Sequence, residues 1–293
     1  MIRFVHTLIL TLIFLLGGCN RGAQEAKREL VSHHITYDLD TFEKYVSRRD
    51  QNITQLFCAA GFLDELQQMH KNALLFEAIE NDLDTLVKAL LESGADPNSI
   101  GNKGMVPLLT SVKRGDHNIS RILLFYGALP NTQSAVNLES ALNYTAGHND
   151  LEHVRLLLDA GADVSQSDGE HTALMVAARQ GNVAVMQELI DNGADVNFPE
   201  GRPLQLAAFS QNPDAVILLL THGAVPLADA WGCTPLHYAA AEQPLKVVIA
   251  LMNAGANADA YCRGYSAHTP LEWAKNSNQE NYDYLLSLKQ QTD

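Results

Sequence analysis

The sequence predicts an all-α fold, a solenoid of stacked helix pairs. The dipeptide Gly-Ala recurs along the chain with spacings of 33, 34, 32, 30 and 32 residues. Each copy is followed by a short polar stretch and then by a new apolar run. A period near 33 residues is typical of a solenoid, in which each unit buries its apolar face against its neighbours. The copies are Gly94-Ala95, Gly127-Ala128, Gly161-Ala162, Gly193-Ala194, Gly223-Ala224 and Gly255-Ala256.

Composition and charge restrict the classes of function. The chain has 293 residues, of which 46% are hydrophobic and 18% charged, as expected of a soluble fold with a substantial core. It carries 20 Lys and Arg against 34 Asp and Glu, a net charge of −14. Phosphates and anionic lipid headgroups repel so acidic a chain. We therefore expect no nucleic-acid partner, and contact with a membrane only through a lipid anchor.

Residues 1–18 predict an export signal. Arg3 precedes an apolar core that runs from Thr7 to Leu16 and ends at two glycines. This core is short for a bilayer span, which needs about 20 apolar residues. The stretch Leu16 to Cys19 resembles the lipobox of bacterial lipoproteins, which implies lipidation and acylation of Cys19 after cleavage. A plain signal peptide or an uncleaved anchor is the alternative.

The next two segments differ in pattern. Residues 19–38 are polar and without periodicity, and they predict a tether that follows the lipidated cysteine. Residues 39–72 show apolar side chains at helical spacing, and they predict short helices that cap the solenoid. Residues 73–293 hold about six full repeats and a C-terminal cap, whose final outer surface is polar.

The repeats begin with a recurring phrase, which is complete at Thr234-Pro235-Leu236-His237. A Thr at this place can cap the first helix with its hydroxyl group, and Pro suits the first helical position because no amide bond is lost there. Small pairs such as Ala239-Ala240 let neighbouring helices approach, and the Gly of Gly-Ala closes the second helix. Copies begin at Ala73, Val106, Ser140, Thr172, Arg202 and Thr234, and a truncated copy begins at Thr269.

The phrase and its period resemble the ankyrin repeat over residues 73 to about 288. The resemblance implies an ankyrin-repeat solenoid of helix pairs with projecting β-turn fingers. Some copies depart from the family's pattern, since Asp82, Asn149 and Gln243 stand where a Gly is usual between the two helices. We expect such departures to weaken single repeats.

No short catalytic motif is present, neither a phosphate-binding Gly-rich loop, a His-Glu-x-x-His pair, a Gly-x-Ser-x-Gly elbow nor a Cys-x-x-Cys pair. We therefore expect no enzyme activity, no cofactor and no metal site. His237 belongs to the structural phrase of the family, so we expect it to hydrogen bond to nearby backbone. The sequence favours a binding module.

The family's exposed positions indicate the binding residues. The two residues after Ala-Ala and the fingers face the concave side, so large side chains there are candidates for partner contacts. The candidates after the small pairs are Lys113, Arg114, Arg179 and Phe209, and those in the fingers are Phe198, Trp231 and Tyr261.

The number of cysteines allows at most one internal disulfide once Cys19 is lipidated, because only Cys58, Cys233 and Cys262 remain. Cys233 and Cys262 fall in adjacent fingers and are the candidate pair. Such a bond requires a Cα separation of about 4.4–6.8 Å, which neighbouring fingers usually exceed. Cys58 lies in a helical pattern and is expected to be a buried thiol.

These observations lead to two classes of function. The first is a lipid-anchored protein at the outer membrane, facing the periplasm, that binds another protein through its concave face. The partner would be a basic or membrane-seeking effector that an immunity protein neutralises, or an enzyme that an accessory or chaperone-like scaffold assists. The second class is an enzyme or small-ligand receptor with a site in residues 35–72.

Overall fold

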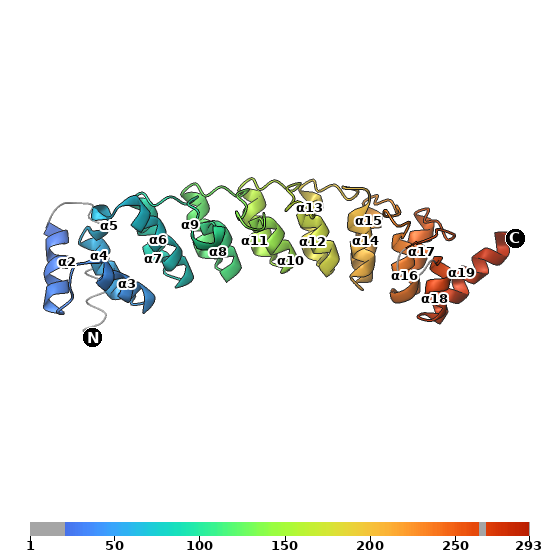
Figure 1. Cartoon of the computed structure of the whole chain (residues 1–293), viewed down its shortest axis with the longest axis horizontal. Helices are drawn as coiled ribbons and strands as arrows, with labels where there is room; N and C mark the ends of the chain where they lie inside the picture. The colour runs from blue at the N-terminus through green and yellow to red at the C-terminus, as the bar shows by residue number, and fades with distance from the viewer. Residues whose placement is uncertain (1–20, 264–267, 293) are drawn as a thin grey trace. The chain divides into compact units, whose positions relative to one another are not determined.

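A computed structural model describes residues 21–263 and 268–292, and this part of the chain is helical (Figure 1). It divides into two compact units, unit 1 within Met1–Leu138 and unit 2 within Glu139–Asp293. The described residues contain no β-strand, and their only β-pairing consists of the isolated bridges Ser167–Thr172 and Cys262–His268. None of the described helices combines the length and the apolar character needed to cross a membrane. The predicted all-α ankyrin-type solenoid is confirmed.

Unit 1 begins with a helical cap, which two helix pairs follow. The pairs are α6 with α7 and α8 with α9, and α6 contacts α8 while α7 contacts α9. The bounds are α2 (Arg21–Ser32), α3 (Leu39–Ser47), α4 (Gln51–Ala59), α5 (Phe62–Glu65), α6 (Gln68–Glu80), α7 (Asp84–Glu92), the 3₁₀ turn η1 (Asn102–Gly104), α8 (Pro107–Arg114) and α9 (His117–Phe125).

Helix α2 lies where the sequence predicted a tether over residues 19–38, and that prediction is wrong for this stretch. Ala26 and Leu30, one helical turn apart, are buried, and α2 contacts α4. Lys27 also serves the packing, because its Nζ lies 3.2 Å from Glu65 Oε1 and 4.5 Å from the centre of the Tyr37 ring. The apolar stripe of α2 is narrow and charged residues surround it, so the sequence shows no clear helical periodicity here.

Aromatic side chains fill the cap that was predicted over residues 39–72. Phe42 and Phe57 are fully buried, with ring centres 5.0 Å apart, and both rings lie within 5.2 Å of Phe62. The predicted boundary with the repeats, between residues 72 and 73, falls inside α6. The repeats therefore begin with a longer first helix than the sequence phrase indicated.

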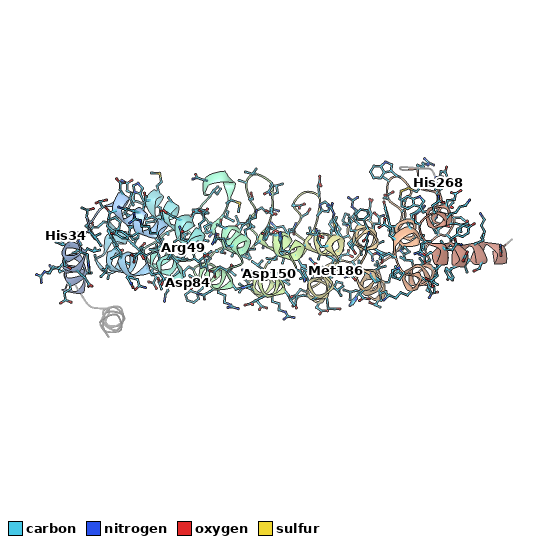
Figure 2. The ribbon with its side chains drawn as sticks, turned by 90° about the horizontal axis from the view of Figure 1, so that it is seen from below. His34, Arg49, Asp84, Asp150, Met186 and His268 are labelled. Atoms are coloured by element: carbon cyan, nitrogen blue, oxygen red, sulfur yellow. A yellow bond between two sulfur atoms is a disulfide. The ribbon has the colours of Figure 1, made fainter. Side chains whose placement is uncertain are left out.

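Unit 2 is a stack of helix pairs in two rows. The first helices α10, α12, α14, α16 and α18 contact one another in that order, and the second helices do the same. Buried side chains such as Met186 lie between the rows (Figure 2). The bounds are α10 (Ala141–Gly147), α11 (Leu151–Asp159), α12 (Ala173–Gln180), α13 (Val183–Asp191), α14 (Arg202–Phe209), α15 (Pro213–Thr221), α16 (Pro235–Glu242), α17 (Leu245–Asn253), α18 (Pro270–Lys275) and α19 (Gln279–Thr292).

The recurring phrase starts first helices as the sequence predicted. At α18, Thr269 and Glu272 form a capping box in which the Glu272 carboxylate accepts the Thr269 N–H at 2.8 Å. At α16 the fully buried His237 takes this role, since its Nδ1 accepts the Thr234 N–H at 3.0 Å and its Nε2 donates to the His268 carbonyl at 3.2 Å. Burial lowers the pKa of His237, so the ring stays neutral and structural. The expectation that it bonds to nearby backbone is confirmed.

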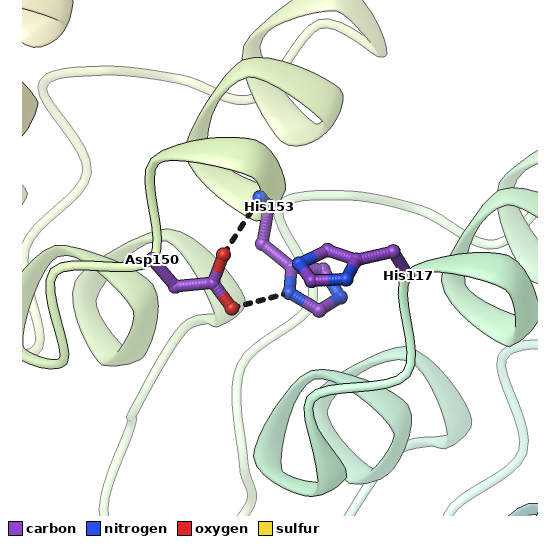
Figure 3. A group of neighbouring side chains, drawn as sticks. All are labelled: His117, Asp150 and His153. Carbon is purple, nitrogen blue, oxygen red and sulfur yellow. Dashed lines mark hydrogen bonds and ion pairs between the residues drawn. The ribbon is translucent and has the colours of Figure 1, made fainter.

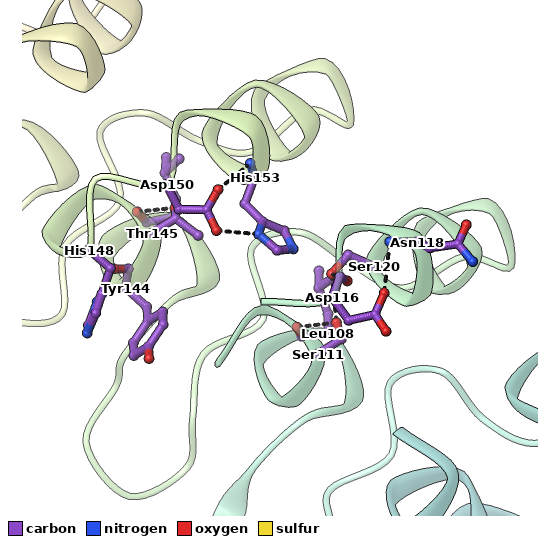
Figure 4. A network of polar contacts seen from close by, with 11 residues as sticks. Leu108, Ser111, Asp116, Asn118, Ser120, Tyr144, Thr145, His148, Asp150 and His153 are labelled. Atoms are coloured by element: carbon purple, nitrogen blue, oxygen red, sulfur yellow. Dashed lines mark hydrogen bonds and ion pairs between the residues drawn. The ribbon is translucent and has the colours of Figure 1, made fainter. Parts of the chain in front are cut away.

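One second helix in each unit, α11 in unit 2 and α9 in unit 1, begins with a carboxylate cap. In unit 2, Asp150 accepts the His153 N–H at 3.1 Å, and its other oxygen lies 2.6 Å from the Nδ1 of that buried ring (Figure 3). In unit 1, Asp116 accepts the Asn118 N–H at 2.9 Å (Figure 4). It also accepts the Ile119 N–H at 2.9 Å. These bonds satisfy amides that the first turn of a helix leaves unpaired. Asp150 and His153 thus form a helix cap rather than an exposed proton-transfer pair.

The departures from the Gly pattern cost less than the sequence suggested. Asp82 and Asn149 have φ values of 56° and 57°, so they adopt the left-handed conformation that Gly115 and Gly181 adopt at this place. Asn and Asp tolerate this region better than other residues with a side chain. Gln243 does not adopt it, with φ of −98°, and it uses its side chain instead.

A ladder of side-chain amides joins successive repeats of unit 2. Each amide lies near the start of a second helix. It donates to carbonyls at the end of the first helix of the preceding repeat. These carbonyls have no partner within their own helix, and leaving them unpaired inside the stack would cost free energy. The side-chain amides supply the missing hydrogen bonds. The hydrogen bonds run from the side-chain amide to the backbone carbonyl in each case: Asn182 to Ala146 at 2.8 Å, Asn212 to Gly181 at 2.7 Å, Gln243 to Ala208 at 3.0 Å, and Asn281 to Ala240 at 3.1 Å and to Gln243 at 2.8 Å.

We predict that Asn281→Ala lowers the free energy of unfolding by about 1–3 kcal/mol, because buried carbonyls lose their donor. Asn281 is fully buried, whereas Asn253, at the end of α17, is exposed. Asn253→Ala is therefore the control, with an expected change below about 0.5 kcal/mol. Urea denaturation followed by circular dichroism measures both. Equal losses in the two variants would contradict the ladder's role.

Candidate interaction surface

The predicted aromatic contacts are exposed in unit 2. More than half of the surface of each side chain is accessible, and Trp231 is the most exposed of them at 63%. Arg179 is also exposed, in the last turn of α12. Such side chains contribute nothing to the core, so their size is available for binding. The aromatic residues are Phe198, Phe209, Trp231 and Tyr261.

Phe209 belongs to an aromatic ladder on the first helices that the sequence reasoning missed. Its ring centre lies 6.0 Å from that of Tyr238 on α16, which lies 5.5 Å from that of Trp273 on α18. Both contacts are edge-to-face, a favourable geometry for aromatic pairs. Tyr238 and Trp273 are partly exposed, and burial raises the pKa of Tyr238, with Asp229 adding to the effect. The signal was present, since each of them stands two positions after the Leu of a Thr-Pro-Leu phrase.

Trp231 and Tyr261 lie on two fingers that are joined covalently. Cys233 and Cys262, the candidate pair from the sequence, form a disulfide with Cα atoms 4.3 Å apart. The Arg263 N–H donates to the Trp231 carbonyl at 2.7 Å. Cys262 also forms an isolated antiparallel β-bridge with His268, which is labelled in Figure 2. The two fingers are therefore much closer than the usual spacing suggested.

Arg114, one of the two cationic candidates in unit 1, is held by an acidic neighbour. Arg114 makes a two-pronged contact with Asp82, at 3.0 and 2.9 Å, and Arg49 approaches the same carboxylate at 3.2 Å. The hydrogen bond with Arg114 lowers the pKa of Asp82. Lys113 is half-buried and also interacts with other groups. Arg114 thus links repeats of unit 1, and a contact with a partner would have to compete with Asp82.

A shallow polar hollow of about 530 Å³ lies in unit 1 beside this ion pair. Asp82 and Arg114 neutralise each other on its wall, and Asp116 is occupied as the cap of α9. These three side chains of the hollow are therefore already engaged within the protein. Its lining consists of Asp82, Arg114, Gly115, Asp116, His117, Asn118 and Arg121.

Residues 35–72, the segment considered for an enzyme or ligand site, use their reactive side chains in packing. The Tyr37 hydroxyl donates to the Ala60 carbonyl at 3.1 Å, and its ring stacks on Phe57. Burial, reinforced by Glu65, raises the pKa of Tyr37. Cys58 is a free, half-buried thiol, and desolvation raises its pKa to about 12, so it is a poor nucleophile.

The acidic excess of the chain is concentrated in residues 139–293. This segment has 7 Lys and Arg against 19 Asp and Glu, a net charge of −12, whereas residues 1–138 have 13 against 15, a net charge of −2. The exposed aromatic residues therefore belong to the strongly acidic part of the chain. Complementary charge accelerates encounter and disfavours wrong partners.

Comparison with known proteins fits this architecture. The family model of ankyrin repeats in three copies matches residues 74–168, 108–200, 142–229, 174–263 and 204–293, which together cover most of the chain. The chain belongs to the ankyrin repeat family. Ankyrin repeats act as protein–protein interaction modules, so the exposed aromatic surface lies on a fold suited to that role.

Relatives and solved structures share these repeats. The chain is 33% identical over 102 residues to an ankyrin repeat-containing protein of Treponema pallidum and 30% identical over 151 residues to the mouse B-cell lymphoma 3 protein homolog, matching 35% and 50% of the chain. It spans about a third of the length of each relative (34%). The structure is similar to the human ASB11 ankyrin repeat domain, with a TM-score of 0.62 and 25% identity over 73% of this chain and 96% of that one.

Proposed function

We propose that this protein is a lipid-anchored, periplasm-facing module that binds another protein through unit 2. The observation that carries the binding surface is the aromatic ladder of Phe209, Tyr238 and Trp273, together with the exposure of the finger residues Trp231 and Tyr261. Large aromatic side chains dominate the energy of protein interfaces. A stack of ankyrin repeats presents them on a rigid scaffold.

The charge of unit 2 favours a basic partner. With a net charge of −12 over residues 139–293, this part of the chain attracts cationic surfaces and repels nucleic acid. A basic effector that enters the periplasm, which the protein would neutralise as an immunity protein, fits this chemistry. If the captured partner keeps its activity in the complex, the protein is instead an accessory scaffold.

The anchor is proposed from the sequence, because Cys19 lies outside the described residues. In enteric-type sorting an Asp after the lipidated Cys retains a lipoprotein in the inner membrane, and residue 20 is Asn. We therefore propose the outer membrane as the location. Cys19 precedes Arg21 of helix α2 by two positions in the sequence, and α2 packs on α4. The anchor would consequently hold unit 1 close to the membrane.

Lipidation is tested by metabolic labelling with a fatty-acid analogue. The wild-type protein should take up the label and fractionate with outer membranes. Cys19→Ser should take up none, because the thioether and the acylated amino group both require this residue. Equal labelling of the two proteins would contradict the anchor.

We predict that Phe209→Ala weakens partner binding by about 1–3 kcal/mol while changing thermal stability little, because 55% of this side chain is exposed. Arg179→Ala should act in the same direction. Phe125→Ala is the matched control, since Phe125 is an exposed aromatic residue on a second helix, α9. A photoreactive amino acid at position 209 should first capture the partner from envelope preparations, and titration of that partner then gives the affinities. Equal effects at positions 125 and 209 would contradict the surface.

A further inference from the structure

Three neighbouring fingers of unit 2, residues 192–201, 222–234 and 254–263, form what we call the finger edge. The first two are joined by Asn197, whose side chain donates to the Gly223 carbonyl at 3.1 Å and accepts the Val225 N–H at 2.9 Å. The Arg263–Trp231 bond joins the second to the third. A line of exposed apolar side chains therefore follows all three. Its members are Phe198, Val225, Leu227, Trp231 and Tyr261.

The finger edge is rigid where its largest side chains lie. Asp229 Oδ1 accepts the N–H groups of both Trp231 and Cys233 at 2.9 Å, which fixes the turn that carries the indole. Gly232, at φ of 80°, packs so closely on the next finger that a Cβ atom there would lie 2.5 Å from the Tyr261 carbonyl oxygen. The Cys233–Cys262 disulfide then closes the pair. A surface held in this way loses little conformational entropy on binding.

Carboxylates are interleaved with the apolar side chains. The three fingers contain four acidic residues and a single basic one, Arg263. The carboxylates can pair with Lys or Arg, and the faces of Trp231 and Tyr261 can receive the same cations. The four acids are Asp195, Glu200, Asp229 and Asp259.

We propose that the finger edge docks a cationic, amphipathic segment of a partner protein, and that the Cys233–Cys262 disulfide holds Trp231 and Tyr261 in the binding arrangement. The inference rests on the proposed function and deepens it by naming the chemistry of the partner. Like charges on a second copy of this chain, or on an anionic lipid surface, would meet the finger edge with repulsion.

The test uses the purified full-length protein with its disulfide intact and a fluorescein-labelled peptide that alternates Lys with Leu. We expect binding by fluorescence anisotropy, weakened by salt, and none with the peptide in which Glu replaces Lys. Trp231→Ala should weaken binding about tenfold, and Phe125→Ala less than about twofold. Asp259→Asn combined with Glu200→Gln should weaken it without touching the disulfide.

The disulfide is tested with Cys233→Ser combined with Cys262→Ser, whose helical content is checked by circular dichroism. We expect the double variant to stay helical and to bind the Lys-Leu peptide about tenfold more weakly than the wild-type protein does. Mild reduction of the wild-type protein gives the same comparison if the double variant does not fold. Unchanged affinity after loss of the disulfide would overturn its proposed role.

Other outcomes would overturn the docking proposal itself. Equal binding of the Glu peptide would refute the preference for cations, and equal loss in Trp231→Ala and Phe125→Ala would refute the location. Dimerisation that Trp231→Ala abolishes, or binding to phosphatidylglycerol vesicles that it abolishes, would assign the finger edge to a second copy or to a membrane. If position 209 still captures a partner while finger-edge variants bind it normally, this inference fails and the proposed function stands.

Discussion

Unit 2 depends on one recurring hydrogen bond. A side-chain amide of each repeat donates to a carbonyl at the end of the first helix of the preceding repeat. A helix ends with carbonyls that have no partner in the helix, and stacking buries these ends where water cannot reach them. Asn182, Asn212, Gln243 and Asn281 satisfy them in four successive repeats. The bond therefore sets the position of each first helix relative to the next, in addition to the apolar burial between the rows.

The proposed binding surface follows from this stacking. Because successive first helices repeat at a fixed spacing, equivalent positions lie next to each other, and Tyr238 and Trp273 meet edge-to-face. The fingers between the helices are also brought side by side, which allows the Arg263–Trp231 bond and the disulfide. Phe209, Trp231 and Tyr261 keep more than half of their surface exposed, so they contribute little to the core of a single repeat. The scaffold supplies rigidity, while the exposed aromatic and acidic residues supply the chemistry of recognition.

The sequence predicted the fold well because its signals are local and repeated. Thr, Pro and Gly mark helix boundaries in several copies, so an error in one copy is corrected by the others. Helix α2 was missed because its stability depends on burial of Leu30, on packing of α2 against α4 and on the Lys27–Glu65 ion pair, which only the folded chain brings about. Gln243 looked like a defect, since a missing Gly is visible in the sequence while a donor for the Ala208 carbonyl is not. Asp82 likewise occupies Arg114, which had been expected to face a partner.

We propose that unit 2 meets its partner with its fingers and first helices. Hydrogen–deuterium exchange on the complex with the captured partner tests it most directly, because protection is read at each amide without any substitution. We expect slower exchange on binding in residues 222–234 and 254–263 and at the ends of α14 and α16, with α13, α15 and α17 unchanged. Protection confined to these second helices would place the partner on the opposite row and refute the proposed binding surface.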